Sequence, residues 1–94
     1  MNIKETYKYI RKNDLKGKKH NKSYYHIAID IIRFRIRGIA YGDWEYGDIL
    51  EYNNKKWIVY YKERDTISMY KEFDNEKQAC EEYLKRLKDL KYIQ

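Results

Sequence analysis

The chain has 94 residues and a mass of 11.8 kDa, which allows one small domain with a modest core. Its formal net charge is +6, 38% of its residues are charged and its mean hydropathy is −1.06. Such values occur in disordered chains, but 17% of the residues are aromatic and none is proline. We therefore expect a folded single domain over residues 1–94.

Several classes of protein are excluded by the sequence. No apolar run approaches the ~20 residues of a membrane-spanning helix, and the N-terminal residues lack the apolar core of a secretory signal. A single cysteine, Cys80, forms no internal disulfide. We expect a cytoplasmic protein that does not bind membranes.

The positive charge lies in the first half of the chain. Residues 1–47 contain eleven Lys and Arg against five Asp and Glu, whereas residues 48–94 contain ten of each. The basic residues form two groups: Arg11, Lys12, Lys16, Lys18, Lys19 and Lys22 in one, and Arg33, Arg35 and Arg37 in the other.

Residues 2–12 have the apolar spacing of a short amphipathic helix, which is expected to end at Asn13–Asp14. The basic segment that follows, to about Ser23, contains Gly17 and Asn21. These two residue types favour a loop.

Residues 24–39 allow two interpretations. Isoleucines alternate up to Ile31, and the alternation then shifts in phase, which predicts a strand with a bulge near Ile31–Ile32. A helix fits nearly as well, although the β-branched content favours the strand. The glycines that follow, Gly38, Gly42 and Gly47, indicate an irregular connection.

From Asp48 onward the pattern predicts a meander of three strands over residues 48–52, 57–63 and 66–73, joined by turns. Both faces of the middle strand are apolar, with Trp57, Val59 and Tyr61 on one and Ile58 and Tyr60 on the other, as in a central strand. On the third strand, alternation places Ile67, Met69 and Phe73 on one side.

The last predicted element is an amphipathic helix that begins at Asp74 or Asn75, either of which can cap it. Its apolar face comprises Ala79, Cys80, Tyr83, Leu84, Leu87 and Leu90. The expected fold is a two-layer α+β domain with an N-terminal helix, an antiparallel meander of three to four strands and a C-terminal helix packed on the sheet.

No residues with the spacing of a catalytic or metal site are evident. His20 and His26 have no partner ligands at a useful spacing, and Cys80 lies on a helix face that is expected to be buried. No glycine-rich phosphate loop is present. We therefore expect neither an enzyme nor a cofactor or metal.

The two basic groups, with Tyr24, Tyr25 and Tyr41 near them, are compatible with nucleic-acid binding. Basic side chains neutralise phosphates, and aromatic rings stack on bases. The chain has no recognisable nucleic-acid-binding motif. A small basic nucleic-acid-binding or regulatory protein is therefore the alternative interpretation.

The C-terminal half resembles small bacterial immunity proteins. The residues that carry the resemblance run from Trp57 to Arg64 (WIVYYKER) and from Phe73 to Leu84 (FDNEKQACEEYL). They are similar to a strand W-x-V-Y-Y-x-E-R-G followed by F-D-x-E-x-x-A-C at the start of a last helix. The chain departs from this pattern at Asp65, where the family has glycine, and residues 24–45 have no counterpart.

The resemblance implies a protein that binds a cognate toxin of a polymorphic or contact-dependent system and blocks it without catalysis. Because the chain is basic, we expect an acidic toxin surface, or contact through the neutral C-terminal half. The partner-binding patch is predicted to comprise Arg33, Arg35, Arg37, Tyr41, Trp44 and Tyr46.

Overall fold

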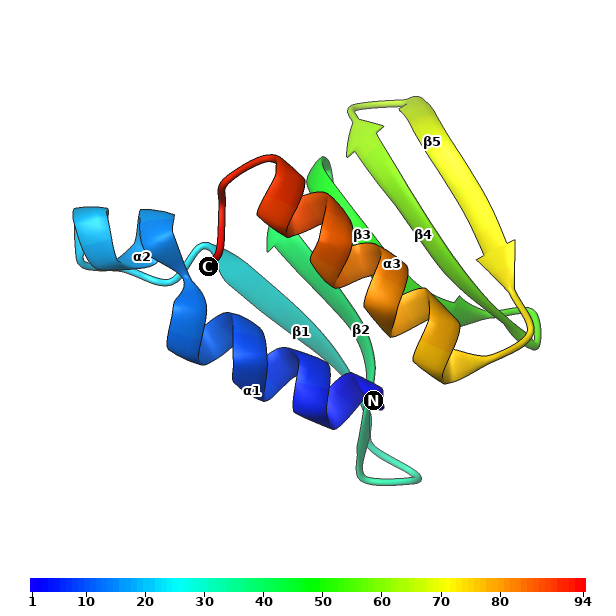
Figure 1. The fold of residues 1–94 in the computed structure, drawn as a ribbon. Helices are drawn as coiled ribbons and strands as arrows, with labels where there is room; N and C mark the ends of the chain where they lie inside the picture. Colours follow the sequence, from blue (N-terminus) through cyan, green and yellow to red (C-terminus); the bar gives the residue numbers. More distant parts are fainter.

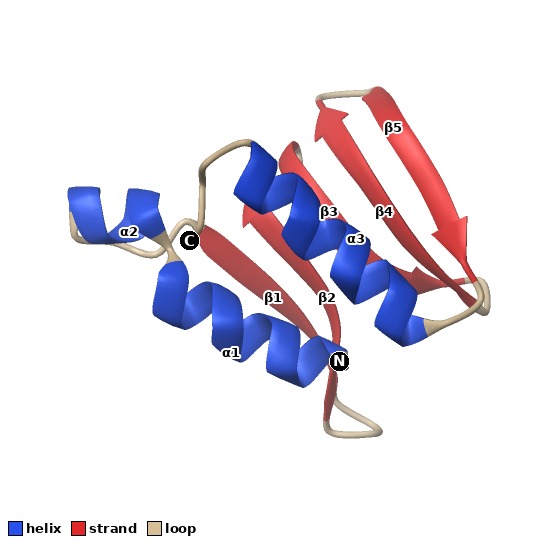
Figure 2. Cartoon of the chain, viewed as in Figure 1, coloured by secondary structure: helices blue, strands red, loops and turns tan.

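The computed structural model describes residues 1–94, which form three helices and five strands. The helices are α1 (Ile3–Asn13), α2 (Leu15–His20) and α3 (Glu76–Asp89). The strands are β1 (Tyr25–Asp30), β2 (Arg35–Gly42), β3 (Tyr46–Asn53), β4 (Lys56–Glu63) and β5 (Thr66–Phe73). The helices α1 and α3 lie side by side on one face of the sheet (Figure 1 and Figure 2). None of the helices is long and apolar enough to cross a lipid bilayer.

The sheet is an antiparallel meander in the order β1-β2-β3-β4-β5. The predicted α+β class, the N-terminal helix, the meander and the C-terminal helix are confirmed. The number of strands is corrected from three or four to five. The strand interpretation of residues 24–39 was too coarse, because this segment contains β1, a turn and the start of β2.

The change of phase after Ile31 marks a turn between two strands rather than a bulge within one. Asp30 accepts hydrogen bonds from the backbone of this turn, and Phe34 adopts a left-handed conformation with φ 52°. The irregularity in the β1–β2 register lies earlier, between Ala28 and Ile29. The helical alternative is wrong, because a β-branched segment with a polar turn residue forms a hairpin here.

The basic segment after Asp14 is a helix, α2, and not the predicted loop. Asp14 ends α1 and caps α2 at once, since its carboxylate accepts a hydrogen bond from the backbone N–H of Gly17 at 3.0 Å. Asn21 closes α2 in the left-handed conformation. Gly17 is buried, and the neighbouring Asp14 side chain and Lys22 backbone leave no room for a side chain there. The glycine therefore allows this close approach and does not indicate a loop.

The glycine-containing region before Asp48 is also more regular than predicted. Gly38 and Gly42 belong to β2 and Gly47 belongs to β3, so only residues 43–45 connect the two strands. Asp43 holds this short connection, because its carboxylate accepts hydrogen bonds from the backbone N–H groups of Glu45 and Tyr46. These two bonds lower the pKa of Asp43.

The core lies between the sheet and the two long helices. The apolar face predicted for α3 is buried in it, apart from Leu90 at the end of the helix, which is exposed. Asn75 caps α3 by accepting from the backbone N–H of Gln78, as predicted. The buried residues of this core are Ile3, Ile10, Ile39, Tyr41, Leu50, Val59, Ala79, Cys80, Tyr83, Leu84, Leu87 and Ile93. A smaller cluster of Ala40, Ile49, Ile58 and Tyr60 covers the other face of the sheet.

The predicted face of β5 is corrected by a bulge. Phe73 lies opposite Trp57, but Ile67 lies opposite Lys62, and residues five apart on β4 face opposite sides of the sheet. Met69, with φ 54°, is the inserted residue that reverses the alternation. Phe73 therefore packs on the core, whereas Ile67 is exposed on the other side.

Candidate functional site

The turn between β1 and β2 projects beyond the sheet (Figure 1), and three of its large apolar side chains are exposed to water. Ile31, Ile32 and Phe34 are 78%, 86% and 89% exposed. We call these three residues the apolar tip. A single exposed apolar side chain is ordinary, but three in one turn form a patch that favours contact with another macromolecule.

Asp30 holds the turn in its shape. One carboxylate oxygen accepts hydrogen bonds from the backbone N–H groups of Ile32 at 3.0 Å and Arg33 at 3.2 Å. The other oxygen forms an ion pair with the Arg33 guanidinium at 3.2 Å. The hydrogen bond from the Arg33 backbone is the main cause that lowers the pKa of Asp30. The apolar tip is thus held in one conformation before any partner arrives.

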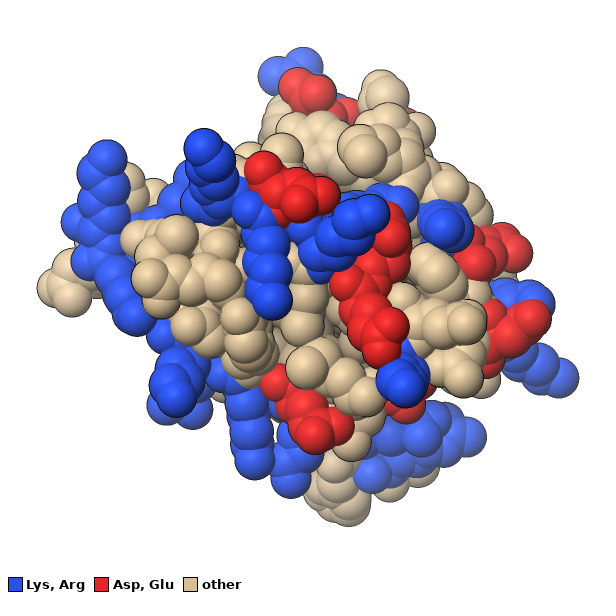
Figure 3. Space-filling view, viewed as in Figure 1, with Lys and Arg blue, Asp and Glu red and all other residues tan.

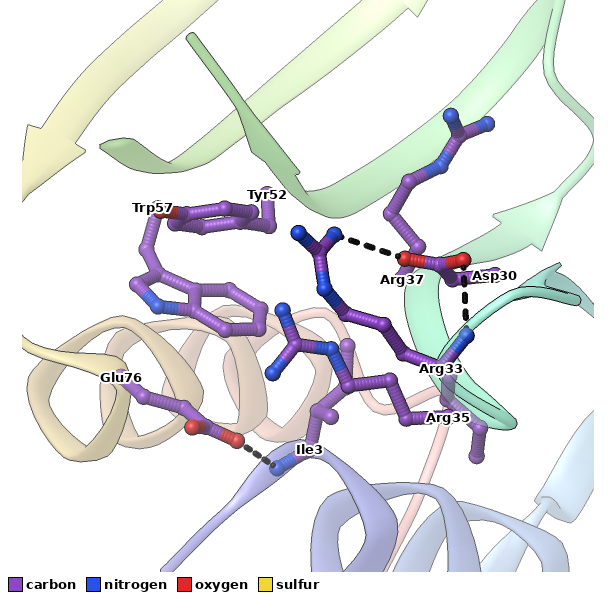
Figure 4. A pocket seen from close by; sticks show the side chains of 9 residues that line it. Ile3, Asp30, Arg33, Arg35, Arg37, Tyr52, Trp57 and Glu76 are labelled. Atoms are coloured by element: carbon purple, nitrogen blue, oxygen red, sulfur yellow. Dashed lines mark hydrogen bonds and ion pairs between the residues drawn. The ribbon is translucent and has the colours of Figure 1, made fainter. Parts of the chain in front are cut away.

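Beside the tip lies a pocket of about 230 Å³ that is lined by all three arginines of the second basic group. Figure 4 shows the guanidinium groups of Arg33 and Arg35 extending toward the rings of Tyr52 and Trp57, whereas Arg37 extends away from them. Tyr52 and Trp57 face each other across β3 and β4, with ring centroids 5.0 Å apart. The pocket therefore combines positive charge with an aromatic wall.

Only one of the three arginines that line this pocket is paired with a carboxylate. Arg33 is paired with Asp30, and Glu76 accepts a hydrogen bond from the backbone N–H of Ile3 at 2.7 Å. Arg35 and Arg37 take part in none of the four ion pairs of the molecule. Figure 3 shows Lys and Arg side chains gathered around the projecting turn and over α2. The surface near the tip therefore has guanidinium groups that are free to bind an anion.

The structure divides the predicted patch of six residues. The three arginines lie together, but Tyr41 is buried in the core. Its hydroxyl donates to the Asp14 carboxylate and its ring stacks on Tyr92 with centroids 5.2 Å apart. Burial raises the pKa of Tyr41. Tyr41 has a structural role, because inward-facing positions of β2 are covered by α1.

Trp44 and Tyr46 lie at the end of the β2–β3 hairpin that is remote from the arginine pocket. The Trp44 ring lies over Gly38 and packs against the smaller apolar cluster, on the face of the sheet that the helices do not cover. Its ring is therefore part of that cluster and not a free contact residue. Tyr46 is partly exposed, and its hydroxyl accepts a hydrogen bond from Arg64. Neither residue lines the pocket.

Sequence reasoning missed Tyr52 and Trp57 as neighbours of the arginines. A signal for part of this arrangement was present, because the predicted hairpin over residues 48–63 already places the two rings opposite each other. Their position beside Arg33 and Arg35 depends on the β1–β2 turn, whose signal was the change of phase after Ile31 that was interpreted as a bulge.

The remaining candidate residues form no site. Burial raises the pKa of the Cys80 thiol, which makes it a poor nucleophile. His26 places Nδ1 2.7 Å from the Gly42 carbonyl oxygen, and His20 lies beside the ring of Tyr24. No three His, Cys, Asp or Glu side chains are close enough together to hold a metal ion.

The two basic groups lie at opposite ends of α1 and are connected by exposed basic residues of that helix, Lys4, Lys8 and Arg11. The group on α2 lies at the C-terminal end of α1, whereas the arginine pocket lies at its N-terminal end (Figure 1). In the α2 group, Lys16 lies over the ring of Tyr92 at 4.3 Å and Lys22 over that of Tyr24 at 5.1 Å. A nucleic-acid strand that bound both ends would follow these side chains of α1.

The chain matches no protein-family model, and comparisons with the curated proteins and the solved structures give no significant match. The resemblance to immunity proteins stays a prediction from residues 57–64 and 73–84.

Proposed function

We propose that this chain is a bacterial immunity protein that binds a cognate protein toxin and blocks it stoichiometrically by covering a surface that the toxin needs. The observation that carries the proposal is the apolar tip, in which Ile31, Ile32 and Phe34 are exposed in a turn held by Asp30. Aromatic residues and arginines are enriched at protein interfaces, and the tip places Phe34 between Arg33 and Arg35.

The shape of the turn favours tight binding. Because Asp30 fixes the backbone in advance, docking the tip costs less conformational entropy than ordering a mobile loop would. Arg35 and Arg37 beside the tip attract a partner with an acidic surface and raise the rate of association. No step in this mechanism requires turnover, a metal or a cofactor.

The resemblance to immunity proteins supports the class of protein rather than the contact surface. Several of the residues that carry the resemblance are buried, among them Val59, Ala79 and Cys80. Such residues support a shared fold. The contact surface is assigned to the apolar tip, in a region for which the family pattern has no counterpart.

The experiment that tests this function begins with affinity capture from the native cell and identification of the captured protein. The captured protein is then expressed in a host that lacks both genes. We expect growth arrest, and we expect co-expression of the wild-type chain to relieve it. A variant with Ile32→Ser and Phe34→Ser is expected to lose the protection.

The matched control is Ile67→Ser, which removes an exposed apolar side chain from β5, away from the tip. It is expected to protect as well as the wild type. The proposal is wrong if the captured protein does not arrest growth, or if the tip variant protects fully. It is also wrong if the captured material is nucleic acid whose binding falls by orders of magnitude between low and moderate salt.

A further inference from the structure

Arg35 stands between two adjoining hollows at the start of α1. The first is the pocket of about 230 Å³ with Tyr52 and Trp57 on its wall. The second has a volume of about 380 Å³ and is lined by Tyr7 and Phe34, the latter belonging to the apolar tip. The two hollows adjoin, because both are lined by Ile3, Arg35, Ile36 and Glu76, and we call them together the groove.

Four cations that line the groove form no ion pair: Arg35, Arg37, Lys4 and Lys8. Asp30 is paired with Arg33 and holds the backbone of the turn, whereas Glu76 accepts a hydrogen bond from the neutral backbone N–H of Ile3 and keeps its negative charge. Arg35 forms no ion pair. Lys4 and Lys8 on α1 line the second hollow and add positive charge to it.

We infer that the groove binds an acidic segment of the partner protein, with a carboxylate on Arg35 and apolar side chains against Trp57 and Phe34. This inference rests on the proposed function and specifies the chemistry of the partner. A guanidinium binds a carboxylate through two parallel hydrogen bonds, which fixes its position as well as its charge. The rings on both sides offer apolar contact.

The apolar tip favours a protein segment over nucleic acid. Cations and aromatic rings occur in both hollows and suit either partner, but the exposed aliphatic side chains of Ile31 and Ile32 need an apolar surface, which a phosphate backbone lacks. The apolar tip continues the groove at the Phe34 end. A folded partner with an acidic side chain next to an apolar patch complements both features.

A fluorescence titration tests the inference without the partner. The chain contains two tryptophans, so a Trp44→Phe variant leaves Trp57 as the only one and makes its emission report on the groove. The probe is the peptide acetyl-AELEA-amide, and its neutral counterpart is acetyl-AQLQA-amide. We expect a saturable change of Trp57 emission with the acidic peptide at a Kd of about 1 mM or below, and at least tenfold weaker binding of the neutral peptide.

Substitutions locate the bound carboxylate. Arg35→Glu is expected to abolish the change in emission, whereas Arg11→Glu, an equal change of charge at the other end of α1, is expected to preserve it. Equal binding of the two peptides, or unchanged binding by the Arg35→Glu variant, would overturn the inference. A larger response of Trp57, equally dependent on Arg35, to oligothymidylate or to phosphatidylserine vesicles would overturn it too.

The captured partner separates this inference from the proposed function. Arg35→Glu is expected to weaken its binding by about 10- to 100-fold. If Arg35→Glu binds the partner as wild type does while the tip variant does not, the groove inference fails and the proposed function stands. If the acidic peptide binds through Arg35 but the partner is not a toxin, the proposed function fails and the groove stands.

Discussion

The hydroxyl of Tyr83 on α3 donates a hydrogen bond to the backbone carbonyl of Asp48 on β3 at 2.8 Å. The ring is fully buried, and the carbonyl of Ile39 on β2 lies 3.5 Å from the same oxygen. Burial raises the pKa of Tyr83 well above its ordinary value, so the hydroxyl keeps its proton and remains a donor. This bond joins the helix to the middle of the sheet.

Replacing Tyr83 by Phe should therefore destabilise the protein. The change leaves the Asp48 carbonyl without this donor in a region that water does not reach, at a cost of about 1–2 kcal/mol in the free energy of unfolding. Urea denaturation measures the difference. Tyr9→Phe is the matched control, because the Tyr9 hydroxyl also donates to a backbone carbonyl, that of Gln94, but in an exposed position. An equal loss in both variants would show that burial has no part in the effect.

Asp48 makes the stability depend on pH. Burial raises the pKa of this carboxyl from 3.8 to about 6, while the positive charges of Arg86 and Lys16 oppose the shift. Between these two values the folded protein holds a proton that the unfolded chain has released. The free energy of unfolding therefore falls as the pH rises through this window, because the folded protein must then bury an ionised carboxylate. This loss of stability is complete above pH 6.

Asp48→Asn should accordingly leave the free energy of unfolding nearly unchanged at about pH 4 and raise it by about 2 kcal/mol at about pH 8. Denaturant titrations at the two pH values provide the measurement. Asp43→Asn is the control of opposite sign, because backbone hydrogen bonds lower the pKa of Asp43 and its stabilising contribution is present above 3.8. A gain for Asp48→Asn that is the same at both pH values would contradict the assignment.

Gly17→Ala should destabilise the protein, although alanine is the better helix former. In an ordinary helix the change gains up to about 1 kcal/mol. In α2, a Cβ atom on Gly17 would lie 2.6 Å from the carbonyl oxygen of Lys22 and closer still to the Asp14 carboxylate. We expect a loss of about 1–3 kcal/mol in the free energy of unfolding. Lys18→Ala, at the exposed neighbouring position, should change it little, and a stabilised Gly17→Ala variant would refute the close approach.

Asp30→Ala should loosen the apolar tip without unfolding the protein. The backbone N–H groups of Ile32 and Arg33 lose their acceptor, so their protection against hydrogen exchange is expected to fall by about tenfold or more. Asp65→Ala, in the turn between β4 and β5, serves as the control and should leave that protection unchanged. In the wild type the same loss is expected as the pH falls below 3.8 through the lowered pKa of Asp30. Unchanged protection in Asp30→Ala would mean that Asp30 does not hold the turn.

The C-terminal half could be predicted because its local signals agree with its tertiary contacts. The strand expected over residues 66–73 has those bounds in the structure, and Asn75 is the cap of the last helix. The predicted shared face of Ile67 and Phe73 on β5 is wrong, because the residue inserted at Met69 reverses the alternation. No residue type at that position indicates a bulge.

Local signals and tertiary contacts disagree in the first half. The residue type of Gly17 suggests a loop, but Gly17 lies in a helix. Asp14 and the Lys22 backbone approach it so closely that no side chain fits there. The residues next to Trp44 in the sequence offer it no apolar partner. Its partners come from β3 and β4, on the face of the sheet that the helices do not cover. The β4 neighbours of Trp44 are distant in the chain, whereas the contacts at Gly17 are local and depend on how the chain turns after α2.

Apolar periodicity and helix caps were enough to define the α+β class, the last three strands and the C-terminal helix, because each depends on residues a few positions apart. The alternation of Arg33 and Arg35 with apolar residues likewise marked them as candidate contact residues. Only the folded chain placed them in one pocket with Trp57, and only it buried Tyr41 in the core. The physical reason is that a groove is made by elements that meet in space, here the start of α1 and two separate hairpins, and no local pattern encodes that meeting.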